Sequence, residues 1–98
     1  MEIDILNEKK QISRKVTIIN ELGMHARPAA KIAEMAEVAS GGIWISNGTN
    51  TVDASSIIDI LAMCAIKGTK VVIEVENTKD IEVMNTIADL FEHGFGET

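Results

Sequence analysis

The chain has 98 residues, of which 46% are apolar and 24% charged, so its length fits one domain and argues against two. A domain of this size buries one thin core and has no room for a deep, enclosed substrate cavity. The net charge of −6 and the few aromatic residues, two Phe and one Trp, oppose binding to nucleic acid or to an anionic membrane.

Cysteine content and apolar runs indicate the compartment. Cys64 is the only cysteine, which excludes a disulfide framework within the chain and a zinc cluster, and favours a reducing environment. Residues 1–14 carry several acidic side chains and lack an apolar run long enough for a signal peptide. No apolar run reaches the roughly 18 residues of a transmembrane helix. We therefore expect a soluble, cytoplasmic protein.

A strand and a helix are predicted first along the chain. Residues 15–20 (KVTIIN) are rich in β-branched side chains and predict a strand that ends at Glu21. Pro28 suits the first turn of a helix that ends at Ser40. The apolar residues that recur at helical spacing in this segment are Ala29, Ile32, Ala33 and Ala36.

A hairpin and a second helix follow. Residues 43–46 and 51–54 predict two short antiparallel strands joined around Asn47-Gly48. Ser55 or Ser56 can cap a helix that runs up to Lys67-Gly68 and includes Cys64 as a packed residue. Its apolar positions are Ile57, Ile58, Leu61, Ala62 and Ala65.

The last two elements are a strand and a helix. Residues 69–76 alternate apolar and polar side chains, which predicts a strand with one buried face formed by Val71, Ile73 and Val75. Residues 80–93 predict a helix that ends at Gly94. The order β-α-β-β-α-β-α, with one apolar face on each element, indicates an α+β fold of two layers with helices on one side of a sheet. Residues 15–98 form this domain, and residues 1–14 are an N-terminal extension, either disordered or a small added element.

The most informative segment joins the first strand to the first helix. His25 precedes the first-turn Pro28, so it lies where free amides and the helix dipole favour anions and keep the imidazole in its neutral, nucleophilic form. Arg27 opposes the dipole, and a contact with a phosphoryl group would explain its presence. No carboxylate occurs between Leu22 and Ala33. This pattern is typical of a site that accepts a phosphoryl group and passes it on.

The same residues also fit a structural interpretation, in which His25 caps the helix or lies in a turn and Arg27 is a solvated surface residue. The residues alone leave these alternatives open. A catalytic triad has little support, because no serine, cysteine or acid lies nearby in the sequence. A metal site has less, because His93 is the only other histidine. We predict no metal and no cofactor.

The segment Gly23-Met24-His25-Ala26-Arg27-Pro28-Ala29 resembles the phosphorylation-site motif of HPr, the histidine-containing phosphocarrier family of the bacterial phosphoenolpyruvate-dependent phosphotransferase system. The likeness continues through Asn47-Gly48 and residues 52–58 and 65–68, and it covers nearly everything from about Lys15 to Gly96. It implies a two-layer open-faced β-sandwich, with an antiparallel four-stranded sheet in the order 1-4-2-3 and three helices on one face.

The resemblance also implies roles for single residues. His25 matches the histidine that is phosphorylated at Nδ1, and Arg27 matches the arginine that partners the phosphate. Ser56 matches a regulatory serine that an HPr kinase/phosphorylase modifies in many bacteria. The alternative for Ser56 is a plain helix cap, with Asp59 three residues later as in a capping box.

A surface for docking partners is implied beside the histidine. It comprises Met24, Ile57, Ile58 and Leu61, although such helical spacing also fits a core. Three features depart from the family pattern: Asp59, an extra residue in the turn from Asn47 to Thr51, and the N-terminal extension. None of them touches the histidine motif.

The resemblance leaves two functions open. In the first, the chain relays a phosphoryl group from enzyme I to enzyme IIA domains as a stoichiometric carrier in the sugar phosphotransferase system. In the second, it is a regulatory paralogue of the nitrogen-branch type, which residues 22–25 and 90–95 resemble, and partners read its phosphorylation state. A small enzyme with His25 as general base is disfavoured because no enclosed pocket is expected. We expect a monomer that binds no nucleic acid and does not insert into a membrane.

Overall fold

The computed structural model describes residues 12–97, and their elements follow the predicted order. These elements are β1 (Ile12–Thr17), α2 (Ala26–Ala36), β2 (Ile43–Ser46), β3 (Thr51–Asp53), α3 (Ile57–Ala62), β4 (Lys70–Val75) and α4 (Ile81–Glu92), with 3-10 turns η1 (Thr78–Asp80) and η2 (Gly94–Gly96) around α4. No helix in this part of the chain is long and apolar enough to cross a membrane.

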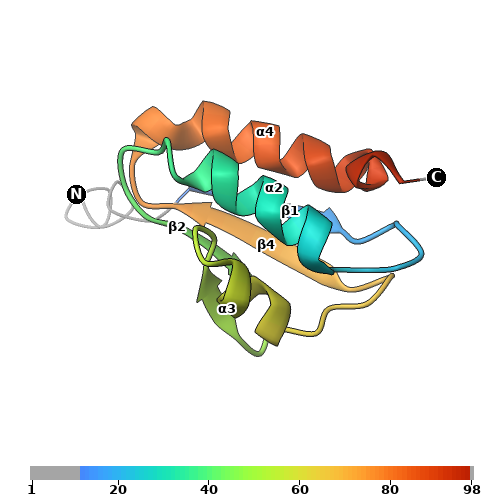
Figure 1. Cartoon of the computed structure of the whole chain (residues 1–98). Coiled ribbons are helices and arrows are strands. Elements are labelled where there is room, and N and C mark those ends of the chain that lie inside the picture. Colours follow the sequence, from blue (N-terminus) through green and yellow to red (C-terminus); the bar gives the residue numbers. More distant parts are fainter. Residues whose placement is uncertain (1–11, 98) are drawn as a thin grey trace, which may run out of the picture.

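One antiparallel sheet with the strand order β1-β4-β2-β3 forms the first layer, as the family resemblance implies. The central strand β4 pairs with β1 on one side and with β2 on the other. Helix α2 contacts both α3 and α4, and the three helices form the second layer (Figure 1). The predicted two-layer α+β architecture is confirmed.

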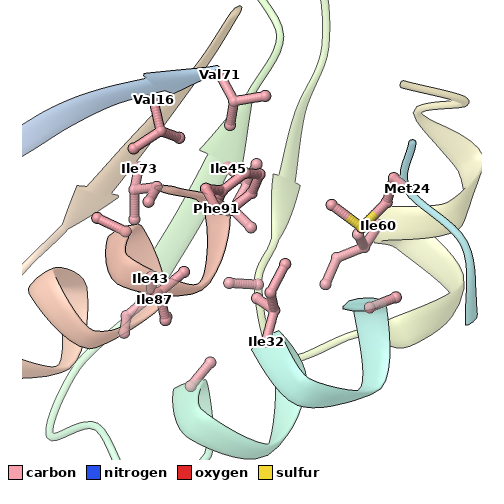
Figure 2. Close-up of a cluster of buried hydrophobic side chains, with 14 of the residues drawn as sticks. Val16, Met24, Ile32, Ile43, Ile45, Ile60, Val71, Ile73, Ile87 and Phe91 are labelled. Carbon is pink, nitrogen blue, oxygen red and sulfur yellow. The ribbon is translucent and has the colours of Figure 1, made fainter. Parts of the chain in front are cut away.

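The core lies between the sheet and the helices. In β4 every second side chain, Val71, Ile73 and Val75, is fully buried, which confirms the predicted apolar face. From α4, the residues Met84, Ile87, Ala88 and Phe91 are buried. Figure 2 shows side chains of the sheet and of the helices meeting in this cluster.

The first strand begins earlier than predicted. It starts at Ile12, and its pairs with β4 run from Ile12↔Val75 to Thr17↔Lys70. Residues 12–14 therefore belong to the sheet and not to an extension. Ile12 packs against the core, and the polar residues Ser13 and Arg14 hid the start of the strand in the sequence. The Arg14 side chain reaches α4 and binds Asn85 and Glu92 there. Residues 1–11 of the expected extension lie outside the described residues.

The predicted second helix is too long, because α3 ends at Ala62 and not near Lys67. Cys64 has φ of 52°, the left-handed conformation that often ends a helix, and its N–H bonds to the Leu61 carbonyl at 3.0 Å. Its side chain is exposed, so the prediction of a packed helix residue is wrong. The chain from Met63 to Ile66 then turns toward the loop that precedes α2, where the Ala65 carbonyl accepts a hydrogen bond from Met24.

Candidate functional site

His25 is the residue from which α2 starts. Its backbone is extended, with φ of −139° and ψ of −171°, and its carbonyl accepts the first helical hydrogen bond, from Ala29 at 3.0 Å. The amides of Ala26 and Arg27 have no acceptor within the helix, as in every first turn. No acidic side chain occupies that turn. The predicted placement of His25 and Arg27 at a helix N-terminus is confirmed.

The loop before His25 lies directly against the chain that follows α3. Gly23 has φ of 69°, and a Cβ there would lie 2.8 Å from the Ala65 carbonyl oxygen, so only glycine fits without a shift. The next amide, that of Met24, donates to the same carbonyl at 2.9 Å. These contacts hold the start of α2 in place.

Met24 is buried by this arrangement. Its side chain is 8% exposed and belongs to the core cluster, where Figure 2 shows it beside Ile60. The prediction that Met24 is part of a docking surface is therefore wrong. The backbone of His25 is extended, a conformation in which consecutive side chains point to opposite sides, so a buried Met24 precedes a partly exposed His25.

The imidazole of His25 contacts a carboxylate from the other end of the chain. Nε2 of His25 lies 2.7 Å from Oε2 of Glu97, and the two side chains are 33% and 17% exposed. The second carboxylate oxygen, Oε1, accepts a hydrogen bond of 3.0 Å from Nδ2 of Asn20. Asn20 also donates to the Gly23 carbonyl at 2.8 Å, so one buried amide binds both the loop and the carboxylate.

Sequence reasoning missed Glu97 and Asn20. Glu97 is 72 residues from His25, and no spacing rule connects residues so far apart. The available signal was local: Gly94 and Gly96 flank Phe95, a pattern that favours a tight turn after α4.

The charge on Glu97 is stabilised where it meets His25. The Asn20 amide, with help from His25 and from the positive charge of Arg27, holds the pKa of the Glu97 carboxyl below its ordinary value, against the opposing effect of burial. Glu97 therefore stays ionised at neutral pH and acts only as a hydrogen-bond acceptor.

Arg27 is exposed, and it makes no ion pair with any residue in the range 12–97. Together with Glu21, Leu22, His25 and Glu97 it lines a shallow hollow of about 180 Å³. A ring nitrogen, a guanidinium and first-turn amides thus meet at an open surface. This combination suits a small anion such as a phosphoryl group.

Exposed apolar side chains are found at Leu22, which lines the hollow, on α3 and in the chain after α3. Of the predicted docking residues, Ile58 is 78% exposed and Ile57 41% exposed, while Leu61 is half-buried and packs against the core. Two residues absent from the prediction are equally exposed, Leu22 at 73% and Ile66 at 72%. Leu22 and Ile66 belong to the two segments that touch at Gly23.

Ser56 is the N-cap of α3, and its hydroxyl oxygen accepts a 3.2 Å hydrogen bond from the amide of Asp59. The capping interpretation is confirmed. Capping does not exclude modification, and the regulatory role stays a prediction.

No group of three or more His, Cys, Asp or Glu side chains in the described part of the chain is arranged to hold a metal ion. The second histidine, His93, uses its ring to donate from Nδ1 to the Asp89 carbonyl at 2.8 Å, one turn earlier in α4. It takes no part in the hollow around His25.

Comparisons with known proteins point to one family. A family model described as "PTS HPr component phosphorylation site" matches residues 12–93. The phosphocarrier protein HPr of Neisseria meningitidis serogroup A is 30% identical over 86 residues, 88% of this chain and 97% of that protein. The phosphocarrier protein NPr of Klebsiella oxytoca is 34% identical over 87 residues, again 88% and 97%. The crystal structure of HPr-C-His from Thermoanaerobacter tengcongensis matches with a TM-score of 0.82 and 32% identity, over 89% of this chain and 98% of that one.

We predict that Gly23→Ala lowers the free energy of unfolding more than Gly48→Ala does. Both glycines have positive φ, so alanine adds about 1–2 kcal/mol of backbone strain at either position. Only at Gly23 does the new methyl also meet a carbonyl oxygen, whereas nothing lies within 4 Å of a Cβ at Gly48. Urea unfolding followed by the fluorescence of Trp44, the one tryptophan, measures both. Equal losses would contradict the close approach at Gly23.

Proposed function

Because the chain belongs to the HPr family of phosphotransferase-system phosphocarriers, we propose that His25 accepts a phosphoryl group from enzyme I and passes it to an enzyme IIA domain. The observation that carries this proposal is the position of His25 at the open N-terminus of α2, within a shallow, exposed hollow that it shares with Arg27. Within residues 12–97 this arginine has no ion-pair partner. A carrier must meet two protein partners in turn, and an open site of this kind gives both of them access.

The reacting atom in this proposal is Nδ1. Nε2 is occupied by Glu97, and the ring makes no hydrogen bond to the amides at the start of α2. The Nδ1 lone pair therefore attacks phosphorus in line. The donor in this proposal is a phosphohistidine of enzyme I. As the new N–P bond forms, the N–P bond of the donor breaks, and its electron pair returns to the donor imidazole. The guanidinium of Arg27 and the first-turn amides stabilise the charge on the transferring oxygens.

The chain acts in this reaction as a stoichiometric carrier. A phosphocarrier takes up one group and gives it away, and it does not convert a substrate of its own. The earlier expectations of a cytoplasmic location and a monomeric state are consistent with such a relay and stay predictions.

The route of the phosphoryl group has two candidates. Relatives under the names HPr and NPr match with similar identity, 30% and 34%, so overall similarity does not separate them. We propose the sugar relay first. The nitrogen-type regulatory role is the second candidate, favoured by Leu22-Gly23-Met24-His25 and by residues 90–95, which resemble that branch.

Partners would dock on the exposed apolar side chains of Leu22, of α3 and of the chain after α3. The proposed docking surface comprises the exposed Leu22, Ile57, Ile58 and Ile66 and the half-buried Leu61, and it excludes the buried Met24. Apolar contacts of this kind bring a partner's histidine close to His25 without a deep pocket.

Incubation with enzyme I and phosphoenolpyruvate should add one acid-labile, base-stable phosphoryl group at His25. Intact-mass measurement of the wild type, His25→Ala and His93→Ala checks this, because only His25→Ala should lose the label. Label that persists in His25→Ala would contradict the assignment. Transfer from the labelled protein to sugar-type and nitrogen-type enzyme IIA domains, compared at equal concentration, separates the two routes.

Arg27→Ala should slow phosphorylation by about 10- to 150-fold, which corresponds to the loss of a charge-assisted hydrogen bond of about 1.5–3 kcal/mol. Stability should change little, because Arg27 is exposed and unfavourable for the helix dipole. Lys79→Ala, which removes the same charge from an exposed residue before α4, is the control for net charge. Rates equal to wild type, or a collapsed thermal melt, would remove Arg27 from the proposed phosphate site.

Ser56→Asp should slow phosphorylation of His25 without lowering thermal stability. Aspartate is a good N-cap, so α3 survives, while the new charge lies beside Ile57 and Ile58 and opposes docking of an apolar partner surface. Thr49→Asp adds the same charge in the exposed turn between β2 and β3 and should leave the rate unchanged. A wild-type rate in Ser56→Asp, and no labelling of the wild type by an HPr kinase, would leave Ser56 as a cap alone.

A further inference from the structure

The segment after α4, residues 94–97, places the carboxylate of Glu97 beside His25. Gly94, Phe95 and Gly96 all have positive φ, at 59°, 56° and 76°. Such a conformation is unfavourable for phenylalanine, and burial of its ring compensates for the strain. The ring is 2% exposed and packs edge-on against Phe91, with centroids 4.9 Å apart.

Further bonds tie this segment to the rest of the domain. Lys31 of α2 donates to the Phe95 carbonyl at 3.3 Å, and the Glu97 amide donates to the Gly94 carbonyl at 3.0 Å. Glu97 is thus held at a defined position beside α2, although it lies beyond the last helix.

Asn20 then orients the carboxylate itself. Its amide nitrogen donates once to Oε1 of Glu97 and once to the Gly23 carbonyl, which uses both of its hydrogens. Within residues 12–97 no donor reaches its buried Oδ1. Both hydrogens of the buried Asn20 amide are therefore used for hydrogen bonds. Because one of them binds Oε1 of Glu97, the other carboxylate oxygen, Oε2, is directed at the imidazole.

An ionised carboxylate accepts hydrogen bonds and donates none. At 2.7 Å from Glu97, Nε2 of His25 must therefore carry the proton, and in the neutral ring the free lone pair is then on Nδ1. As Nδ1 bonds to phosphorus, positive charge develops on the ring, and the carboxylate on Nε2–H stabilises it.

We propose that Glu97, held by Asn20, is a positioning residue that fixes the Nε2–H tautomer of His25 and stabilises the ring while Nδ1 accepts the phosphoryl group. Only the second part of this inference, the stabilisation of the ring during phosphoryl transfer, rests on the proposed function. The tautomer is a property of the unphosphorylated protein, and it can be measured without any partner.

The test compares Glu97→Gln, which keeps the size of the side chain and removes its charge, with Glu97→Ala. Glu34→Gln, at an exposed position of α2 without a side-chain hydrogen bond, is the matched control. Long-range ¹H–¹⁵N correlation spectra of the imidazole report the tautomer. The wild type and Glu34→Gln should show Nε2–H alone, and both Glu97 variants should show a mixture.

The rate of phosphorylation by enzyme I should fall about tenfold in both Glu97 variants, the size expected at the lower limit for a hydrogen bond to a charged group. An unchanged tautomer overturns the proposal, whether or not the rate falls. An unchanged rate overturns it as well. If His25→Ala still takes up the phosphoryl label, the proposed function is refuted. The tautomer measurement remains valid in that case, because it needs no phosphorylation.

Discussion

The close approach of the Gly23 backbone to the Ala65 carbonyl determines where α2 begins. The Met24 amide donates to that carbonyl, and the absent side chain of Gly23 makes the distance possible. Because Met24 then turns into the core, the next residue, His25, faces the surface with an extended backbone. The open amides of the first turn and the exposed side chain of Arg27 follow from that one junction.

The packing of α4 explains why the end of the last helix lies at this junction. Helix α4 packs over β1 and β4, and Lys31 of α2 binds the carbonyl of Phe95 just after α4 ends. The end of α4 therefore lies beside the start of α2, as the antiparallel course of the two helices shows (Figure 1). A carboxylate shortly after α4 can reach His25 for this reason, with no other element between them.

Local patterns predicted the elements well, because their periodicity is strong. The alternation in β4 and the apolar stripe of α4 correspond to the buried faces of both elements. The failures occurred where tertiary contacts decide. Residues 12–14, two of them polar, form a strand because β4 offers them partners. Cys64 leaves the helix because the chain must turn back toward Gly23.

The residues of the candidate site also fall into those that local sequence patterns predict and those that tertiary contacts determine. His25 and Arg27 were predictable, since the reason for both lies within one turn of helix. Glu97 and Asn20 were not, because their contacts depend on the packing of Phe95 and on the course of the chain after α4. A motif identifies the group that reacts, and long-range packing determines its surroundings.

In the proposed relay these surroundings have opposing effects. A carrier must bind the phosphoryl group well enough to take it and weakly enough to release it. Arg27 attracts the phosphoryl oxygens, while the ionised Glu97, which lines the same hollow, repels them. The same carboxylate stabilises the charged ring through Nε2. Arg27 and Glu97 therefore act in opposite directions on a bound phosphoryl group, and the proposed carrier needs such a balance because it must both accept the group and release it.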